Sequence, residues 1–138
     1  MPSPAFQFPA APSPDALAHF QAKLQFETDC WDVHASLENG AADFVLLDAR
    51  SPELFRRGHV PGARNLPHGK IVAGKMREYP ADTRFVVYCA GPHCNGADKA
   101  AARLAALGLP VKLMIGGITG WLDEGFALET AEAAGTPA

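Results

Sequence analysis

Two cysteines five residues apart, Cys89 and Cys94, are the side chains whose type and spacing best fit covalent chemistry. The thiolate is the reactive form of cysteine, and a free thiol has a pKa of roughly 8.5. Successive backbone N–H groups in a tight loop bind anions, and a helix that follows the loop adds the positive end of its dipole. We therefore expect the segment after Cys89 to favour a nucleophilic thiolate on this residue.

The rest of this loop supplies candidates for binding an anionic substrate or a persulfide. Pro92 has no N–H, so the candidate substrate-binding residues are Ala90, Gly91, His93, Cys94, Asn95 and Gly96. The two glycines also permit backbone conformations that a Cβ would forbid. Some alternatives stay open at this point. Cys89 could instead be a buried, inert residue at a strand end, Cys94 either resolves an oxidised Cys89 as a disulfide or is a bystander, and His93 either touches substrate or is solvated.

Regular elements on both sides position this loop. The continuous apolar run 85–88 predicts a strand buried on both faces, and an Ala/Leu-rich helix follows the loop and ends at Gly108. A second apolar strand, 44–47, ends in Asp48-Ala-Arg50. Side chains at the carboxyl ends of parallel strands meet at one edge of a sheet. Asp48 and Arg50 are therefore possible supporting residues, although pairing with nearby groups is the simpler role for both.

The remaining pattern alternates strands with helices, which predicts an α/β domain with a mainly parallel sheet and helices on both faces. Further short strands are expected at 26–28, 63–66 and 111–115. Further helices are expected from Pro14 through Leu24 with Ser13 as N-cap, from Cys30 to Asn39 with Asp29 as N-cap, and at 52–57, 75–78 and 119–124. We expect a flexible tail over 1–13, one domain over 14–129 and a frayed tail over 130–138.

Composition restricts the class of protein. The 138 residues suffice for one domain, 48% of them are hydrophobic, and the net charge of −3 with no basic patch argues against a nucleic-acid partner. Three cysteines form no disulfide framework, which favours a reducing compartment. No Lys or Arg precedes Lys23 and no long apolar run occurs, so we expect neither a signal peptide nor a membrane partner, and a cytoplasmic location. Cys30 is expected in the core, and no metal site is expected, because tetrahedral zinc needs a fourth ligand.

Four stretches in this order resemble the rhodanese-like (sulfurtransferase) family over roughly residues 14–129. They are Leu46-Leu-Asp48-Ala-Arg50 with Glu53, Gly58-His-Val-Pro-Gly-Ala-Arg-Asn65, Val86-Val-Tyr-Cys89 with its loop and helix, and Gly116-Gly117 with Trp121. The resemblance is to single-domain members with a Cys-x-Gly-Pro-x-Cys loop. It implies the rhodanese-like three-layer sandwich, and it implies no metal and no organic cofactor.

The resemblance also implies the reaction. Cys89 would accept a sulfane sulfur from a small donor such as thiosulfate, become a persulfide, and pass the sulfur to a thiol or cyanide-like acceptor, which includes a protein thiol. The protein would act as a monomer or homodimer. One alternative is a non-catalytic redox-sensing or binding module that uses a Cys89–Cys94 disulfide. A phosphatase or arsenate reductase is a weaker alternative, because such enzymes need an arginine clamp and no Arg or Lys occurs from Ala90 to Asp98.

Overall fold

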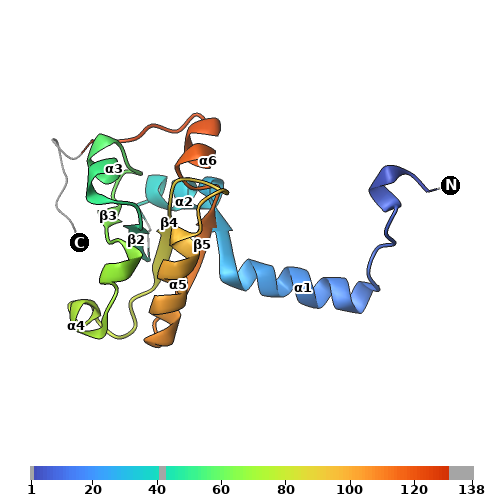
Figure 1. The fold of residues 1–138 in the computed structure, drawn as a ribbon, viewed down its shortest axis with the longest axis horizontal. Coiled ribbons are helices and arrows are strands. Elements are labelled where there is room, and N and C mark those ends of the chain that lie inside the picture. The colour runs from blue at the N-terminus through green and yellow to red at the C-terminus, as the bar shows by residue number, and fades with distance from the viewer. Residues whose placement is uncertain (1, 41–42, 131–138) are drawn as a thin grey trace.

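A five-stranded sheet in the order β1-β5-β4-β2-β3 forms the centre of the protein (Figure 1). The computed structural model describes residues 2–40 and 43–130. Every pairing between neighbouring strands is parallel, which confirms the predicted α/β class and parallel sheet. The strands are β1 Glu27–Asp29, β2 Val45–Asp48, β3 Arg64–Asn65, β4 Phe85–Tyr88 and β5 Val111–Ile115.

Helices cover both faces of the sheet, as expected for a three-layer fold. On one face α5 (Gly96–Ala106) and α4 (Ala73–Met76) pack over Leu47 and Val87, and the short 3-10 helix His68–Lys70 lies on the same side. On the other face α2 (Cys30–Glu38), α3 (Pro52–Arg57) and α6 (Gly117–Asp123) pack over Val86 and Met114. Alternate residues of the central strands thus enter two separate cores.

Strand β4 shows why a fully apolar run lies at the centre. All four of its residues are buried, with Phe85 and Val87 in the core beneath α5 and Val86 and Tyr88 in the core beneath α6. Hydrogen-bonded neighbours on both sides satisfy its backbone. This central position holds the carboxyl end of β4, and therefore Cys89, at a fixed place on the edge of the sheet.

Several predicted boundaries shift by one to three residues. Asp29 caps α2 as predicted, because its side chain accepts a hydrogen bond from the Asp32 N–H at 2.8 Å. The first helix, α1, spans Ser13–Phe26, so Ser13 lies inside it rather than acting as the N-cap. The predicted strand 63–66 is only two residues long, and the helices expected at 75–78 and 119–124 begin two residues earlier. Residues 131–138 of the predicted C-terminal tail lie outside the described residues.

Helix α1 departs most from the expected arrangement. The predicted domain begins at residue 14, yet α1 contains no buried residue and projects from the sheet and its covering helices (Figure 1). Only its carboxyl end touches the body, where Lys112 Nζ donates to the Leu24 carbonyl at 2.8 Å. The segment before α1, predicted as an extended tail, contains a 3-10 turn at Pro4–Phe6. No helix among the described residues is long and apolar enough to span a membrane.

Candidate active site

The loop after β4 is seated on the amino-terminal turn of α6. The N–H of Ile118 donates to the Cys89 carbonyl at 3.1 Å, and the Thr119 N–H and hydroxyl both donate to the Ala90 carbonyl at 3.0 and 3.1 Å. Gly117 makes this contact possible, because a Cβ at this position would lie 2.3 Å from the Cys89 carbonyl oxygen. The Gly116-Gly117 turn and the cysteine loop therefore form one closely fitted unit.

Within the loop the two cysteines lie close together. Cys89 is 4% exposed, and its Sγ donates a hydrogen bond to the Cys94 carbonyl at 3.1 Å. A Cβ on Gly96 would lie 3.5 Å from the Cys94 sulfur and 3.9 Å from the Cys89 sulfur, so the start of α5 approaches both side chains. The turn is closed by the Cys94 N–H, which donates to the Gly91 carbonyl at 3.0 Å. Cys89 and a second thiol, Cys94, are thus held together at the amino-terminal end of α5.

The two thiols differ in acidity in a way that corrects the sequence-based expectation. Burial raises the pKa of Cys89, the hydrogen bond with Cys94 raises it further, and the N–H groups of Ala97 and Gly91 only partly oppose this. The hydrogen bond from Cys89 lowers the pKa of Cys94, and the Gly96 N–H lowers it further. The loop favours a thiolate as predicted, but it favours it on Cys94, because Cys94 is less buried and accepts a hydrogen bond from its neighbour.

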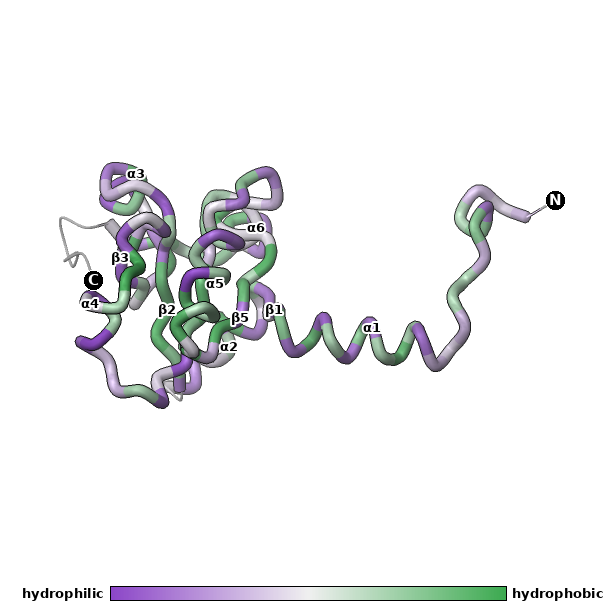
Figure 2. Tube along the Cα trace, turned by 60° about the horizontal axis from the view of Figure 1, so that its bottom comes forward, coloured by the Kyte–Doolittle hydropathy of each residue, from purple (hydrophilic) through white to green (hydrophobic). Residues whose placement is uncertain are grey.

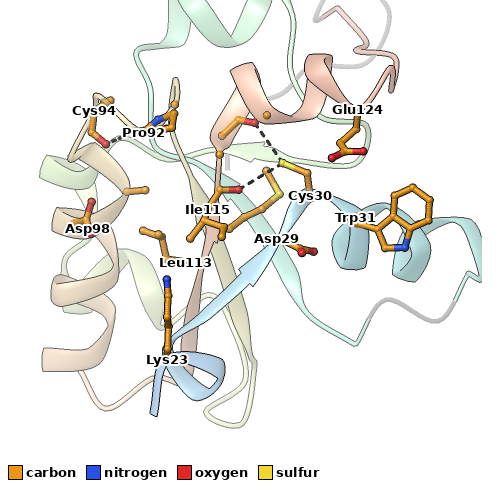
Figure 3. A pocket seen from close by; sticks show the side chains of 17 residues that line it. Lys23, Asp29, Cys30, Trp31, Pro92, Cys94, Asp98, Leu113, Ile115 and Glu124 are labelled. Carbon is orange, nitrogen blue, oxygen red and sulfur yellow. Dashed lines mark hydrogen bonds between the residues drawn. The ribbon is translucent and has the colours of Figure 1, made fainter. Parts of the chain in front are cut away.

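A cleft of about 600 Å³ opens beside these thiols (Figure 3). Its walls come from α1, α2, the loop after β4, strand β5 and α6. Charges of both signs surround it, with one cation, Lys23, and three carboxylates, Asp29, Asp98 and Glu124. The volume suits a small molecule or the tip of an extended peptide.

Cys30 lies in the wall of the same cleft. Its Sγ points at the carbonyls of Ile115 and Gly117, each at 3.6 Å (Figure 3). Burial, followed by the charges of Asp29 and Glu124, raises the pKa of this thiol to about 11. Cys30 belongs to the core as predicted, and as a neutral thiol it also braces the turn on which the cysteine loop is seated.

The predicted loop residues lie around the thiols but do not all reach the cleft. Gly91, Cys94 and Cys89 line the cleft, whereas His93 does not. His93 is exposed, and its ring lies over Gly91, where a Cβ would lie 3.2 Å from the His93 Cε1. Ala90, Asn95 and Gly96 contribute backbone, since the N–H groups of Ala90 and Gly96 both lower the pKa of Cys94 and the Asn95 carbonyl accepts the first hydrogen bond of α5.

Asp48 and Arg50, the possible supporting residues, form a buried network that does not line the cleft. The fully buried Asp48 carboxylate accepts from Arg50 Nη2 at 2.8 Å and from the Tyr88 hydroxyl at 2.8 Å. Burial, with the neighbouring Asp48 charge, raises the pKa of Tyr88 well above its ordinary value, so the hydroxyl stays a donor. Arg50 also donates to the Gly58 carbonyl at 2.6 Å. This network anchors the residue directly before Cys89.

Lys23, Trp31 and Glu124 line the cleft although none was selected from the sequence. The sequence contains a usable signal for Trp31, because Cys30-Trp31 follows strand β1 directly and parallel strands end at one edge of the sheet. No comparable signal marks Lys23, which comes from α1, or Glu124, which follows α6. Among residues 2–40 and 43–130, no three His, Cys, Asp or Glu side chains gather closely enough to hold a metal ion.

Comparison with known proteins decides the family. A model of the rhodanese-like domain matches residues 31–124, which is more than half of the chain. The chain belongs to the rhodanese-like family. This confirms the resemblance drawn from the four sequence stretches and the fold class that it implied. The matched range contains the cysteine loop and the Gly-Gly turn, but it excludes α1 and β1.

Three relatives illustrate how this rhodanese-like domain occurs elsewhere. The BH2092 protein of Bacillus halodurans is 35% identical with a TM-score of 0.83, and the match covers 86% of this chain and 87% of that one. The RPA3614 protein of Rhodopseudomonas palustris, named as a possible tyrosine phosphatase, is 30% identical with a TM-score of 0.58 over 79% and 89% of the two chains. An HTH-type transcriptional regulator of Mycobacterium tuberculosis is 30% identical over 95 residues, which are 69% of this chain but only 42% of the regulator.

Proposed function

We propose that this rhodanese-like protein is a sulfurtransferase that carries a sulfane sulfur as a persulfide on Cys89. The observation that carries the proposal is the placement of this thiol. Cys89 stands at the end of a buried central strand, inside a loop of N–H donors, next to a second thiol of lowered pKa, and it borders a cleft of about 600 Å³. A purely structural cysteine needs none of these features.

In the proposed first step the Cys94 thiolate accepts the proton of Cys89 while the Cys89 sulfur attacks the sulfane sulfur of the donor. A bond forms between Cys89 Sγ and that sulfur, and the bond between that sulfur and the rest of the donor breaks, with its electron pair leaving on the donor fragment. The products are a Cys89 persulfide anion and a neutral Cys94. The Gly91 and Ala97 N–H groups, which already lower the pKa of Cys89, stabilise the new anion.

In the second step an acceptor takes the outer sulfur. The acceptor is a thiolate or a cyanide-like nucleophile, and it attacks the terminal sulfur of the persulfide. The bond between the two sulfurs breaks, and its electron pair returns to Cys89. We propose either a small thiol or a protein thiol on an extended segment as the acceptor. We place this chemistry in the cytoplasm, where thiol acceptors stay reduced.

The charges of the cleft favour donors of low negative charge. Among the described residues, Lys23 is the one cation that lines the cleft, against the carboxylates of Asp29, Asp98 and Glu124. Thiosulfate places two negative charges on the reacting group and would find no paired cations here, whereas the persulfide group of an organic donor carries one at most. We propose persulfides of small thiols as the preferred donor class.

Intact-protein mass spectrometry after incubation with thiosulfate or glutathione persulfide tests the proposal. We expect a gain of one sulfur atom in the wild type and in Cys30→Ser, and none in Cys89→Ser. Cys94→Ser keeps the nucleophile but loses the proton acceptor, so it should load more slowly at neutral pH. If no donor adds sulfur to the wild type, or if the added sulfur persists in Cys89→Ser, the proposed reaction is wrong.

The closely placed thiols favour one alternative, a redox module that closes a Cys89–Cys94 disulfide without sulfur transfer. A wild type that loses two hydrogens under mild oxidation, yet never gains sulfur from any donor, would establish that alternative. The phosphatase suggested for the Rhodopseudomonas relative has less support. A phosphatase loop needs a bidentate arginine clamp, and no arginine lines the cleft in the described part of the chain.

A further inference from the structure

Helix α1 presents an apolar stripe that its own domain leaves uncovered. Leu17, Phe20 and Leu24 follow one another at spacings of three and four residues and are 59%, 59% and 70% exposed. Figures 1 and 2 show the helix extending away from the sheet, with hydrophobic segments recurring along it. An isolated helix shorter than about 12–15 residues is marginal in water. The 14 residues of α1 therefore require a partner surface, which residues 2–40 and 43–130 do not provide.

We propose that α1 is a dimerisation helix that packs antiparallel against α1 of a second copy of this chain. The narrow stripe has the spacing of alternate a and d positions in a heptad, which is the pattern of a helix that packs on one other helix rather than on a broad core. Each other helix of six or more residues in the described part of the chain already buries residues in its own domain. The helix that matches this stripe in length, spacing and exposure is α1 itself.

A two-fold axis near Phe20 satisfies both copies at once. The same surface meets itself across the axis, so the assembly closes as a dimer and leaves no open end. Lys23 is the one charged side chain that borders the stripe between Leu17 and Leu24, and it pairs with Glu27 of its own chain at 3.1 Å. In the antiparallel arrangement Lys23 lies beside the amino-terminal half of the partner helix, so no like charges meet.

The available apolar area makes up most of what a standard interface buries. Six large apolar side chains on α1 and around its junction with the body are 40% to 70% exposed, namely Leu17, Phe20, Leu24, Phe26, Trp31 and Ile115. A fully exposed aromatic side chain offers about 150–250 Å², so the six together offer on the order of 600 Å². A standard interface buries roughly 800 Å² from each partner. Phe20, Leu24 and Ile115 also share one groove at the base of α1, where the partner helix can extend the contact.

Similarity to a solved structure extends to residues before the rhodanese-like domain. The match to the Bacillus halodurans protein covers 86% of the chain, which is more than residues 31–138 make up, so it includes residues before the rhodanese-like domain. The carboxyl end of α1 also borders the cleft, because Lys23 lines the cleft together with Cys89. A dimer formed through α1 therefore places a second copy beside the mouth of each cleft.

Light scattering coupled to size exclusion, over dilutions from high to sub-micromolar concentration, tests the dimer on the full chain. We expect the wild type to be a dimer, and Phe20→Asp to weaken association by at least roughly a hundred-fold, since each substitution acts on both halves of the interface. Ala18→Asp adds the same charge to the same helix outside the stripe and should leave the dimer intact. Phe20→Ala keeps high helix propensity and should still weaken association by roughly ten-fold or more.

Hydrogen exchange of the α1 amides completes the test. Protection that depends on concentration, together with dimer loss only in the Phe20 variants, supports the proposal. A wild type that is monomeric at every concentration overturns it, whether α1 is protected by folding back on its own domain or is unprotected. A dimer that tolerates Phe20→Asp as well as Ala18→Asp also overturns it. Unchanged circular dichroism of the sheet in each variant shows that the domain stays folded.

Discussion

Replacing Gly117 with alanine should damage both the stability of the domain and the position of the cysteine loop. Gly117 has a φ of +57°, a region that costs an L-residue about 1–2 kcal/mol. A Cβ there would also lie 2.3 Å from the Cys89 carbonyl oxygen and 2.8 Å from the Gly91 nitrogen, both of which are backbone atoms. Overpacking of this kind costs a further 1–3 kcal/mol or so. We expect the free energy of unfolding to fall by about 2–5 kcal/mol.

Gly40→Ala is a matched control for the conformational cost alone. Gly40 has a similar φ of +63°, and a Cβ there would meet no atom within 4 Å. For a domain of this length about 1 kcal/mol corresponds to a change of roughly 3–4 °C in Tm. Gly117→Ala should therefore melt roughly 6–20 °C below the wild type, and Gly40→Ala roughly 3–8 °C below. Urea unfolding gives the free energies, and persulfide loading reports the loop position. Equal destabilisation by the two variants, with normal loading in both, would refute the close seating of the loop on α6.

Two further predictions concern the buried hydroxyl and the thiols. Tyr88→Phe removes the hydroxyl that donates to the buried Asp48 carboxylate, so the free energy of unfolding should fall by about 1–3 kcal/mol. Tyr79→Phe, which removes an exposed hydroxyl, should cost about a few tenths of a kcal/mol. Equal losses of unfolding free energy in urea would contradict the stabilising role of the buried hydrogen bond. Iodoacetamide should label Cys94 first, and the pH midpoint of this labelling should lie below the ordinary range for cysteine. The midpoint should rise in Cys89→Ala, because the hydrogen bond from Cys89 is the main cause of the lowered pKa of Cys94. Cys30, with a pKa of about 11, should stay unlabelled until the protein unfolds, and early labelling of Cys30 by peptide mapping would contradict its assigned burial.

Local sequence patterns correctly predicted those strands and helices whose formation depends on residues close together in the sequence. The run 85–88 consists of large, mainly apolar side chains, and all four residues are buried in the centre of the sheet. Asp29 caps its helix, as predicted, because a short polar side chain can reach the N–H three residues later. The loop around Cys89 was found for the same reason, since glycines, a proline and a helix start mark it in consecutive residues.

The acidity of the thiols could not be predicted this way. Loop N–H groups favour a thiolate, and that much follows from the sequence. Which sulfur carries the charge depends on how deeply each one is buried and on which one donates the hydrogen bond between them. Burial is a property of the folded loop, so the sequence-based expectation chose Cys89, and the structure places the more acidic thiol at Cys94.

The order of the strands in the sheet brings residues from distant parts of the chain together at the site. Cys30 follows β1 and Cys89 follows β4, and β5 alone lies between those strands in the sheet. All three strands run parallel, so their carboxyl ends reach the same edge, and the turn after β5 lies between the two cysteines. Cys30 therefore donates to the carbonyls around that turn, and the turn in turn supports the loop of Cys89. A local sequence pattern predicts whether a segment forms a helix, a strand or a loop. Which segments become its neighbours depends on the order of the strands in the sheet.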